Sequence, residues 1–95
     1  MSVTLSPEAV ADWIAAVGHV REQNPAAAAR LHDRIHSTIM KLAHREFEGA
    51  EQTLRRGAVR VRSWPVPPYR IYYQRTGVEL VVLRLYHGAR KPIVR

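Results

Sequence analysis

Two periods of apolar residues divide the chain. In residues 1–54 apolar positions recur every three or four residues, whereas from about residue 59 onward they recur at every second position. A repeat near 3.6 is typical of a helix with one buried side, and a repeat of two is typical of a half-buried strand. We therefore predict helices in the first part and strands in the second.

The first part predicts a short strand followed by a helix. Val3 to Leu5 is the expected strand. Ser6-Pro7-Glu8 then supplies an N-cap hydroxyl, a proline at the first helical position and a carboxylate near the positive end of the helix. Apolar residues at i, i+3, i+4 and i+7 form one stripe, which we expect to face the core: Val10, Trp13, Ile14 and Val17.

A second helix is expected from about Pro25 to about His44. Asn24-Pro25 repeats the signal of a cap followed by proline, and the short connection makes the two helices an antiparallel hairpin. Its buried seam is expected to contain Ala28, Leu31, Ile35, Ile39 and Leu42. Glu48 to Gly57 is polar and holds two glycines, so we expect a loop there.

The second part predicts three antiparallel strands. They are expected around Val59–Arg62, Arg70–Tyr73 and Val78–Tyr86, where residues alternate or are rich in β-branched types. Pro65, Pro67 and Pro68 break the chain between the first two strands, and Thr76-Gly77 makes the tight turn between the second and the third. Because the last strand is apolar at nearly every position, we expect it to sit centrally in the sheet.

Alternation sorts the strand residues onto two faces of the sheet. One face is expected to be apolar and covered by the helices, and it holds Val59, Val61, Ile71, Tyr73, Val81, Leu83 and Leu85. The opposite face holds Arg60, Arg62, Trp64, Arg70, Tyr72, Leu80, Val82, Arg84 and Tyr86. No predicted element remains to cover this second face, so its mixture of side chains indicates a partner surface. The alternative is a solvated face on which arginines lie over their aromatic neighbours.

We predict a single α+β domain over residues 1–95: a short N-terminal strand, an antiparallel helical hairpin and then a three-stranded antiparallel sheet. With 46% hydrophobic and 24% charged residues, the composition is ordinary for a soluble globular chain. The chain contains no cysteine, which excludes a disulfide and a thiolate metal site. No apolar run approaches the roughly 20 residues of a membrane helix. We therefore expect a cytoplasmic protein without a membrane partner.

Charge is divided as unevenly as periodicity. Residues 55–95 hold ten Arg or Lys against one acidic residue, Glu79, which gives +9, whereas residues 1–54 hold five basic against seven acidic residues, which gives −2. The formal net charge of +7 is therefore a property of the strand-forming part. A surface of this kind favours an anionic partner, either an acidic protein segment or nucleic acid.

The amino-acid sequence of the strand-forming part resembles those of the ParE toxins of the RelE/ParE superfamily. The resemblance lies in Val61 to Tyr73 and in Leu83 to Arg90. These stretches contain an arginine, an aromatic-Pro-Val step, a Tyr-x-Ile-x-Tyr strand and a closing His-Gly-x-Arg. The resemblance implies the toxin of a bacterial type II toxin-antitoxin pair, folded as a strand, a helical hairpin and an antiparallel sheet.

Two functions occur in that superfamily. RelE-like members are ribonucleases that cleave messenger RNA on the ribosome with lysine, arginine and a C-terminal tyrosine, whereas ParE-like members bind and poison DNA gyrase. After Arg90 this chain ends without a tyrosine, and the segment before the second expected strand offers Arg55, Arg56 and Arg60 but no lysine. The resemblance therefore favours a gyrase poison that is not an enzyme, with no catalytic residue.

Side-chain chemistry gives the same preference. Arginine keeps its proton, with a pKa above about 12, so it stabilises phosphate charge but is a poor base. In this part of the chain His87 alone titrates near neutrality. If the protein were a ribonuclease, its catalytic residues would be Arg62, His87 and Arg90. The alternative for His87 is a hydrogen bond to a backbone carbonyl at the strand end.

No cofactor or metal is expected. His32 and His36 lie one helical turn apart, a spacing seen in zinc sites, but no carboxylate pattern such as His-Glu-x-x-His accompanies them. We interpret them as part of a solvated helix flank. The sequence also lacks a glycine-rich phosphate loop and a nucleophile elbow.

The resemblance implies two protein partners. One is a ParD-like antitoxin with a C-terminal segment that folds on the toxin, giving a hetero-oligomer, and its expected contacts are Arg62, Trp64, Arg70, Tyr72, Leu80, Val82, Arg84 and Tyr86. The other is DNA gyrase, with Arg62, Arg84, His87 and Arg90 as expected contacts. A third hypothesis is a basic nucleic-acid-binding module, in which Trp64, Tyr72 and Tyr86 would stack on bases.

Overall fold

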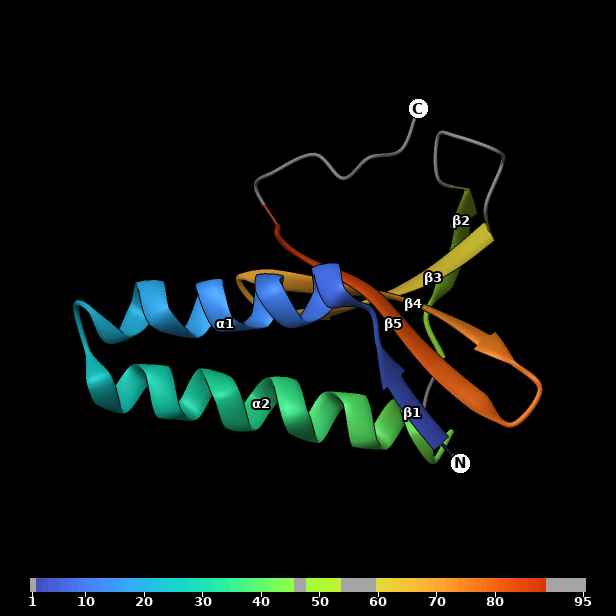
Figure 1. Ribbon diagram of the computed structural model, residues 1–95, viewed down its shortest axis with the longest axis horizontal. Coiled ribbons are helices and arrows are strands. Elements are labelled where there is room, and N and C mark those ends of the chain that lie inside the picture. The colour runs from blue at the N-terminus through green and yellow to red at the C-terminus, as the bar shows by residue number, and fades with distance from the viewer. Residues whose placement is uncertain (1, 46–47, 54–59, 89–95) are drawn as a thin grey trace.

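A computed structural model of the protein describes residues 2–45, 48–53 and 60–88 (Figure 1). In chain order its elements are β1 (Ser2–Leu5), α1 (Pro7–Arg21), α2 (Pro25–Ala43), β2 (Ala50–Thr53), β3 (Arg60–Val66), β4 (Tyr69–Thr76) and β5 (Glu79–His87). The strands form one sheet in the order β1-β5-β4-β3-β2. β1 pairs with β5 in parallel, and all other pairs are antiparallel. The predicted α+β fold is confirmed.

One strand was not predicted. Ala50–Thr53 was expected to be part of a loop, but it pairs antiparallel with β3 as an edge strand. Its sequence, Ala-Glu-Gln-Thr, shows no apolar alternation, so periodicity gives no signal for it. Pairing still occurs because the backbone groups of β3 need hydrogen-bond partners.

Both helices begin where their caps were predicted. The Ser6 hydroxyl oxygen accepts a hydrogen bond from the Ala9 N–H at 3.0 Å, and the Asn24 side-chain oxygen accepts one from the Ala27 N–H at 3.0 Å. These bonds satisfy N–H groups that have no partner inside a helix. Neither described helix is long and apolar enough to cross a membrane.

The predicted seam of α2 is confirmed, because all five of its residues are buried. The stripe predicted for α1 is only partly correct. Val17 is buried and Trp13 packs against the core, but Val10 and Ile14 are 43% and 68% exposed. Small residues, Ala9 and Ala16, face the core instead. Helix α1 therefore lies close to α2 and β5 (Figure 1), while Val10 and Ile14 remain outside the core.

A β-bulge in β5 overturns part of the face assignment. Tyr72 lies opposite Arg84 and Tyr73 opposite Val82, which leaves Leu83 as an extra residue in β5. Before the bulge the core-facing residues of β5 are Leu80 and Val82, at even positions, and after it the core-facing residue is Leu85, at an odd position. The prediction that Leu80 and Val82 lie on the uncovered face is wrong, since both are buried under the helices. Val81 and Leu83, predicted to face the core, lie outside the main core cluster.

The faces of β3 were also predicted the wrong way round. Trp64 lies opposite Ile71 and Val66 opposite Tyr69, so Trp64 packs on the helix-covered side. Pro65 lies within β3, and the turn to β4 begins only at Pro67, which sets a register one residue away from the predicted faces. The expected position of Val59 lies outside the described residues.

The other face of the sheet carries a second small apolar cluster. Val61, Tyr72 and Tyr86 are buried there, with Leu83 packed against them. The Tyr72 and Tyr86 rings meet edge to face, with their centroids 5.7 Å apart. Tyr72 and Tyr86 are thus on the predicted face, but they are not exposed as a partner surface would require. Val61, predicted to lie under the helices, belongs to this cluster instead.

Helix α1 completes the edge of β5 where β1 ends. β1 reaches only as far as the pair Leu5 and Val82. Beyond it, the Ser6 hydroxyl donates to the Leu83 carbonyl at 2.7 Å, and the Asp12 carboxylate accepts from the Leu85 N–H at 3.0 Å. The same carboxylate accepts from Arg84 Nε at 2.8 Å. Two side chains at the start of α1 therefore satisfy backbone groups that a strand would otherwise pair.

We predict that Asp12→Ala lowers the free energy of unfolding by about 1–3 kcal/mol, because it removes the acceptor of the half-buried Leu85 N–H and of Arg84. Asp12→Asn keeps one acceptor oxygen and should lose less. Urea unfolding measures both, with Asp33→Ala on the exposed side of α2 as the control. Equal stabilities of Asp12→Ala and Asp33→Ala would contradict this role of Asp12.

Candidate functional site

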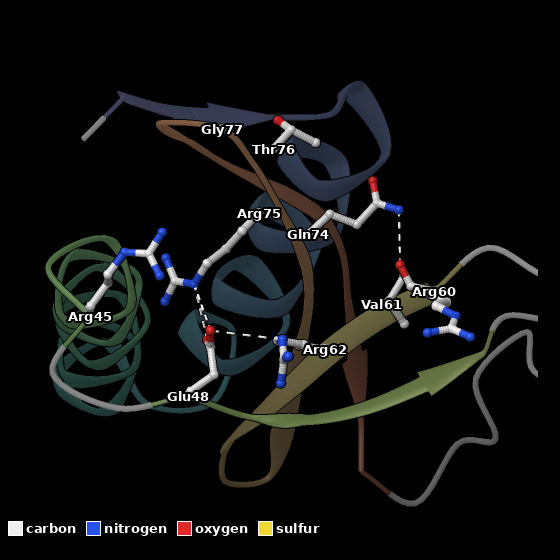
Figure 2. Close-up of a pocket in the computed structure, with 9 residues that line it drawn as sticks. All are labelled: Arg45, Glu48, Arg60, Val61, Arg62, Gln74, Arg75, Thr76 and Gly77. Atoms are coloured by element: carbon white, nitrogen blue, oxygen red, sulfur yellow. Dashed lines mark hydrogen bonds and ion pairs between the residues drawn. The ribbon is translucent and has the colours of Figure 1, made fainter.

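A pocket of about 510 Å³ opens beside the β3–β4 end of the sheet, next to the C-terminus of α2 (Figure 2). We call it the arginine pocket. It is lined by Arg45, Glu48, Arg60, Val61, Arg62, Gln74, Arg75, Thr76 and Gly77. Four guanidinium charges face one carboxylate among these residues, which leaves a local charge of +3. Such a concave and electropositive surface attracts anions.

Arg45 enters the pocket through an unusual backbone conformation. Helix α2 ends at Ala43, and the Arg45 N–H donates to the Leu42 carbonyl at 3.1 Å. The φ angle of Arg45 is +59°, in the left-handed region. Glycine is the usual residue at this position after a helix, and another residue costs roughly 1 kcal/mol there. This backbone directs the Arg45 side chain toward the space above Glu48 in Figure 2.

Glu48 is held from two sides. Arg75 Nε lies 2.8 Å from Glu48 Oε2 and 3.1 Å from Oε1, and the Tyr73 hydroxyl donates to Oε1 at 2.6 Å. Arg62 is more distant, with its Nε 3.7 Å from Oε2 (Figure 2). A further Arg75 nitrogen donates to the Leu42 carbonyl at 2.5 Å, near the end of α2. Glu48 and Arg75 therefore form a fixed pair that joins the helix end to β4.

These contacts shift two pKa values in opposite directions. The hydrogen bond from Arg75, with a smaller one from Tyr73, lowers the pKa of Glu48 below its ordinary value of 4.5. Burial, with the hydrogen bond to Glu48, raises the pKa of Tyr73 to about 12. At neutral pH Glu48 is therefore charged, and Tyr73 keeps the proton that it donates to Glu48.

Gly49 allows the chain to approach β3 closely. A Cβ atom at this position would lie 1.9 Å from the Ser63 carbonyl oxygen, so only glycine fits. The Gly49 N–H donates to the Tyr73 hydroxyl at 2.8 Å, and its carbonyl accepts from Arg62 Nη1 at 2.8 Å. Gly49 thus orients both the residue that holds Glu48 and one of the pocket's arginines.

On the outer face of the sheet the predicted arginines have partners within the chain. Arg84 pairs with Asp12 and lies over the Tyr86 ring, 4.6 Å from its centroid. The hydrogen bond to Asp12 raises the pKa of Arg84 above its ordinary value. Arg70 Nη1 donates to the Ser63 hydroxyl at 3.0 Å. This geometry agrees with the alternative of arginines lying over aromatic neighbours more closely than with an open partner surface.

His87 lies at the far end of the helix-covered side. It is exposed, and its ring meets that of Tyr69 edge to face at 5.3 Å. Arg62 pairs with Tyr73 and His87 pairs with Tyr69, four positions apart along β4, which corresponds to about 13 Å. The structure therefore does not bring Arg62, Arg84 and His87 into one cluster. Arg90 lies outside the described residues.

Of the predicted antitoxin contacts, those on the outer face are Arg70, Tyr72, Arg84 and Tyr86. Leu80 and Val82 belong to the core, and the half-buried Trp64 packs against that core. Arg62 lines the arginine pocket. The predicted contact set is thus spread over three environments, because the register of β3 and the bulge in β5 differ from simple alternation.

A second surface is apolar and lies on α1. This groove of about 380 Å³, which we call the α1 groove, is lined by Leu5, Val10, Trp13, Ile14, Val17, Arg21 and His32. The seven described residues of this lining include no carboxylate. His32 contacts the Trp13 ring at 5.2 Å, so this histidine belongs to the groove. In residues 2–45, 48–53 and 60–88, no three His, Asp or Glu side chains gather as metal ligands would.

Sequence reasoning missed Arg45, Glu48, Gly49 and Arg75 as members of one site. They come from a helix end, a segment expected to be a loop and a strand, and no local spacing connects them. Glu48-Gly49 before an unpredicted edge strand gives no motif. Arg45 gives no signal in the sequence either, because its left-handed backbone is seen only in the structure.

Comparison with known proteins identifies the sequence more specifically than the site geometry does. The profile of a family described as ParE toxin of type II toxin-antitoxin system, parDE, matches residues 3–92. A solved structure described as a chromosomal ParDE TA system from P. aeruginosa is similar at 22% identity. The match has a TM-score of 0.68 and covers 92% of this chain and 95% of that one. At this identity the likeness concerns the fold. No curated protein sequence matches this chain.

We predict that Glu48 makes the stability of the fold depend on pH in the acid range. Because its pKa is lowered in the folded state, its stabilisation is fully present above about pH 4.5 and is lost as the pH falls through the folded pKa. Glu48→Gln should remove this part of the acid dependence. Urea unfolding between about pH 7 and 3 measures it, with Glu22→Gln as the control. Parallel pH curves for wild type and Glu48→Gln would show that the pair contributes nothing.

Proposed function

Because this chain belongs to the ParE toxin family of type II toxin-antitoxin systems, we propose that it poisons DNA gyrase and is neutralised by a ParD-like antitoxin. The observation that supports the proposal best is the family match over residues 3–92, which includes all of the helices and strands except the first residue of β1. The similar structure belongs, by its description, to a ParDE system. In this proposal the protein is a cytoplasmic toxin that acts by binding its target and uses no cofactor or metal.

Side-chain chemistry supports a binding toxin over a ribonuclease. RNA cleavage through the 2′-hydroxyl needs groups that exchange protons near neutral pH. On the outer face, Arg84 is held charged by Asp12, and Tyr72 and Tyr86 are buried. His87 is about 13 Å along β4 from the position of Arg62. This arrangement favours contacts with anionic groups over proton transfer.

The α1 groove supports the proposed antitoxin contact. A segment that folds on binding needs apolar surface to offset the entropy of its ordering. The outer face of the sheet offers little of it, because Val61, Tyr72 and Tyr86 are already buried. Val10 and Ile14 are exposed in the groove, and Arg21 adds a positive charge to its lining. We therefore place the apolar residues of the antitoxin segment in this groove, while Arg70 and Arg84 remain candidates for its acidic residues.

We predict that the isolated protein inhibits ATP-dependent supercoiling by purified gyrase and traps cleaved DNA, and that the cognate antitoxin relieves both effects. Arg90→Ala should weaken the inhibition at least tenfold, because a hydrogen bond to a charged group contributes about 1.5–3 kcal/mol and about 1.4 kcal/mol corresponds to a factor of ten. Arg30→Ala, at an exposed position of α2, should leave it unchanged. Full supercoiling at excess folded protein would exclude gyrase poisoning, and a ribosome-dependent RNA cleavage assay with His87→Ala would follow.

We predict that Ile14→Glu weakens antitoxin binding at least tenfold, because a carboxylate would then be buried against apolar residues. Ile14 is 68% exposed, so the variant should keep its fold. Calorimetric titration measures the affinity, and Ala29→Glu makes the same charge change at an exposed position of α2 outside the groove. Equal affinities of the two variants would place the antitoxin elsewhere.

A further inference from the structure

Of the residues that line the arginine pocket, only Arg62 was also expected to contact gyrase or the antitoxin. Its charge of +3 is concentrated in one concave space, whereas the arginines of the outer face lie against Asp12 and Ser63. Within the pocket, Glu48 is bound closely by Arg75, and Arg62 lies farther from it at 3.7 Å. In the part of the lining that the structure describes, Glu48 is the single carboxylate beside Arg45, Arg62 and Arg75.

Arg45 is the residue that most strongly suggests that the positive charge of the pocket has a function. Its left-handed backbone would be adopted more easily by glycine, yet the chain carries an arginine there. Among the described residues its guanidinium has no hydrogen-bond or ion-pair partner, so contacts within the fold do not account for it. The structure thus holds an exposed cation over the pocket at a position where arginine is unfavourable.

The fixed parts of the pocket prepare it for an oxyanion. Arg62 is oriented by its hydrogen bond to the Gly49 carbonyl, which keeps one edge of its guanidinium in place. The Glu48–Arg75 pair forms one wall, and Arg45 stands beside it (Figure 2). Arg60 lies at the opposite end of the pocket from Arg45 (Figure 2). Guanidinium groups with fixed planes suit carboxylate and phosphate oxygens.

The lining favours phosphate over an acidic protein segment. Val61 is the one large apolar side chain among the described lining residues, and it is 2% exposed. A protein segment would find no apolar anchor there, whereas the α1 groove offers several. Among the described residues of this lining there is no aromatic ring on which an unpaired base could stack. Duplex DNA presents phosphates without unstacked bases, and so it matches this lining best.

We propose that the arginine pocket binds backbone phosphates of duplex DNA, with Arg45 and Arg62 as the principal contacts. The proposal does not depend on gyrase as the target, and it is tested on the isolated protein. Binding of this kind is independent of sequence and weakens with salt, because each neutralised phosphate releases counterions. It would hold the protein on DNA while other surfaces contact a protein partner.

The test is fluorescence anisotropy of a labelled duplex of about 20 base pairs, titrated with full-length protein between about 50 and 200 mM salt. Arg45→Gly should raise the Kd about five- to tenfold and reduce the slope of log Kd against log salt by about 0.9, the value for one lost phosphate contact. Its melting temperature should equal or exceed that of wild type, because glycine suits the left-handed backbone. Arg30→Gln removes the same charge from the exposed part of α2 and should leave Kd and slope nearly unchanged.

Three results would overturn the proposal. Equal effects of Arg45→Gly and Arg30→Gln would show that only the overall charge attracts DNA. Tighter, Arg45-dependent binding of a single-stranded RNA of equal length would assign the pocket to RNA. Arg45-dependent binding of a polyglutamate peptide, with DNA binding unaffected by the mutation, would assign it to an acidic protein segment.

Discussion

The edge of β5 beyond β1 is where the two layers of the molecule are joined. β1 pairs only with the first half of β5, and the second half would leave backbone groups unpaired next to α1. Ser6 and Asp12 satisfy these groups from the start of α1, so the helix is fixed to the strand by hydrogen bonds as well as by packing. The bulge at Leu83 lies at this junction and brings Leu85 to the core while Arg84 reaches Asp12. The helix position, the core and the outer face all follow from this junction.

The arginine pocket depends on the same core through Tyr73. Its ring is fully buried, and its hydroxyl reaches out between α2 and β2 to contact Glu48 and Gly49. Since Gly49 in turn orients Arg62, the pocket is built on a rigid buried residue and not on a loose loop. This support preorganises Arg62 for an anion, because a guanidinium that is already held loses little side-chain entropy when the ligand binds.

The sequence was sufficient to predict every helix and strand except β2, but it was insufficient to predict which strand residues face the core. The caps at Ser6 and Asn24 and the seam of α2 are local features, and each was predicted correctly. The turn between β4 and β5 was predicted one residue too early, since it consists of Gly77 and Val78. The exposure of Ile14 and the burial of Leu80 were not, because both depend on how elements pack. A single bulge exchanges the two sides of a strand, and apolar residues on both sides of β5 hide it from pattern analysis. The arginine pocket was not predicted for a related reason, since its residues come together only through tertiary contacts.

The exposed apolar side of α1 and the arginine pocket both result from small residues at buried positions, but the two surfaces differ in character. Along α1, alanines face the core, so the larger Val10 and Ile14 are left outside. Beside β3 and β4, a glycine allows close approach, so long arginine side chains gather around one carboxylate. The first surface gains affinity from buried area, which varies little with salt, while the second gains it from charge, which salt screens strongly. A partner bound at the α1 groove and one bound at the pocket should therefore be separable by ionic strength alone, without any mutation.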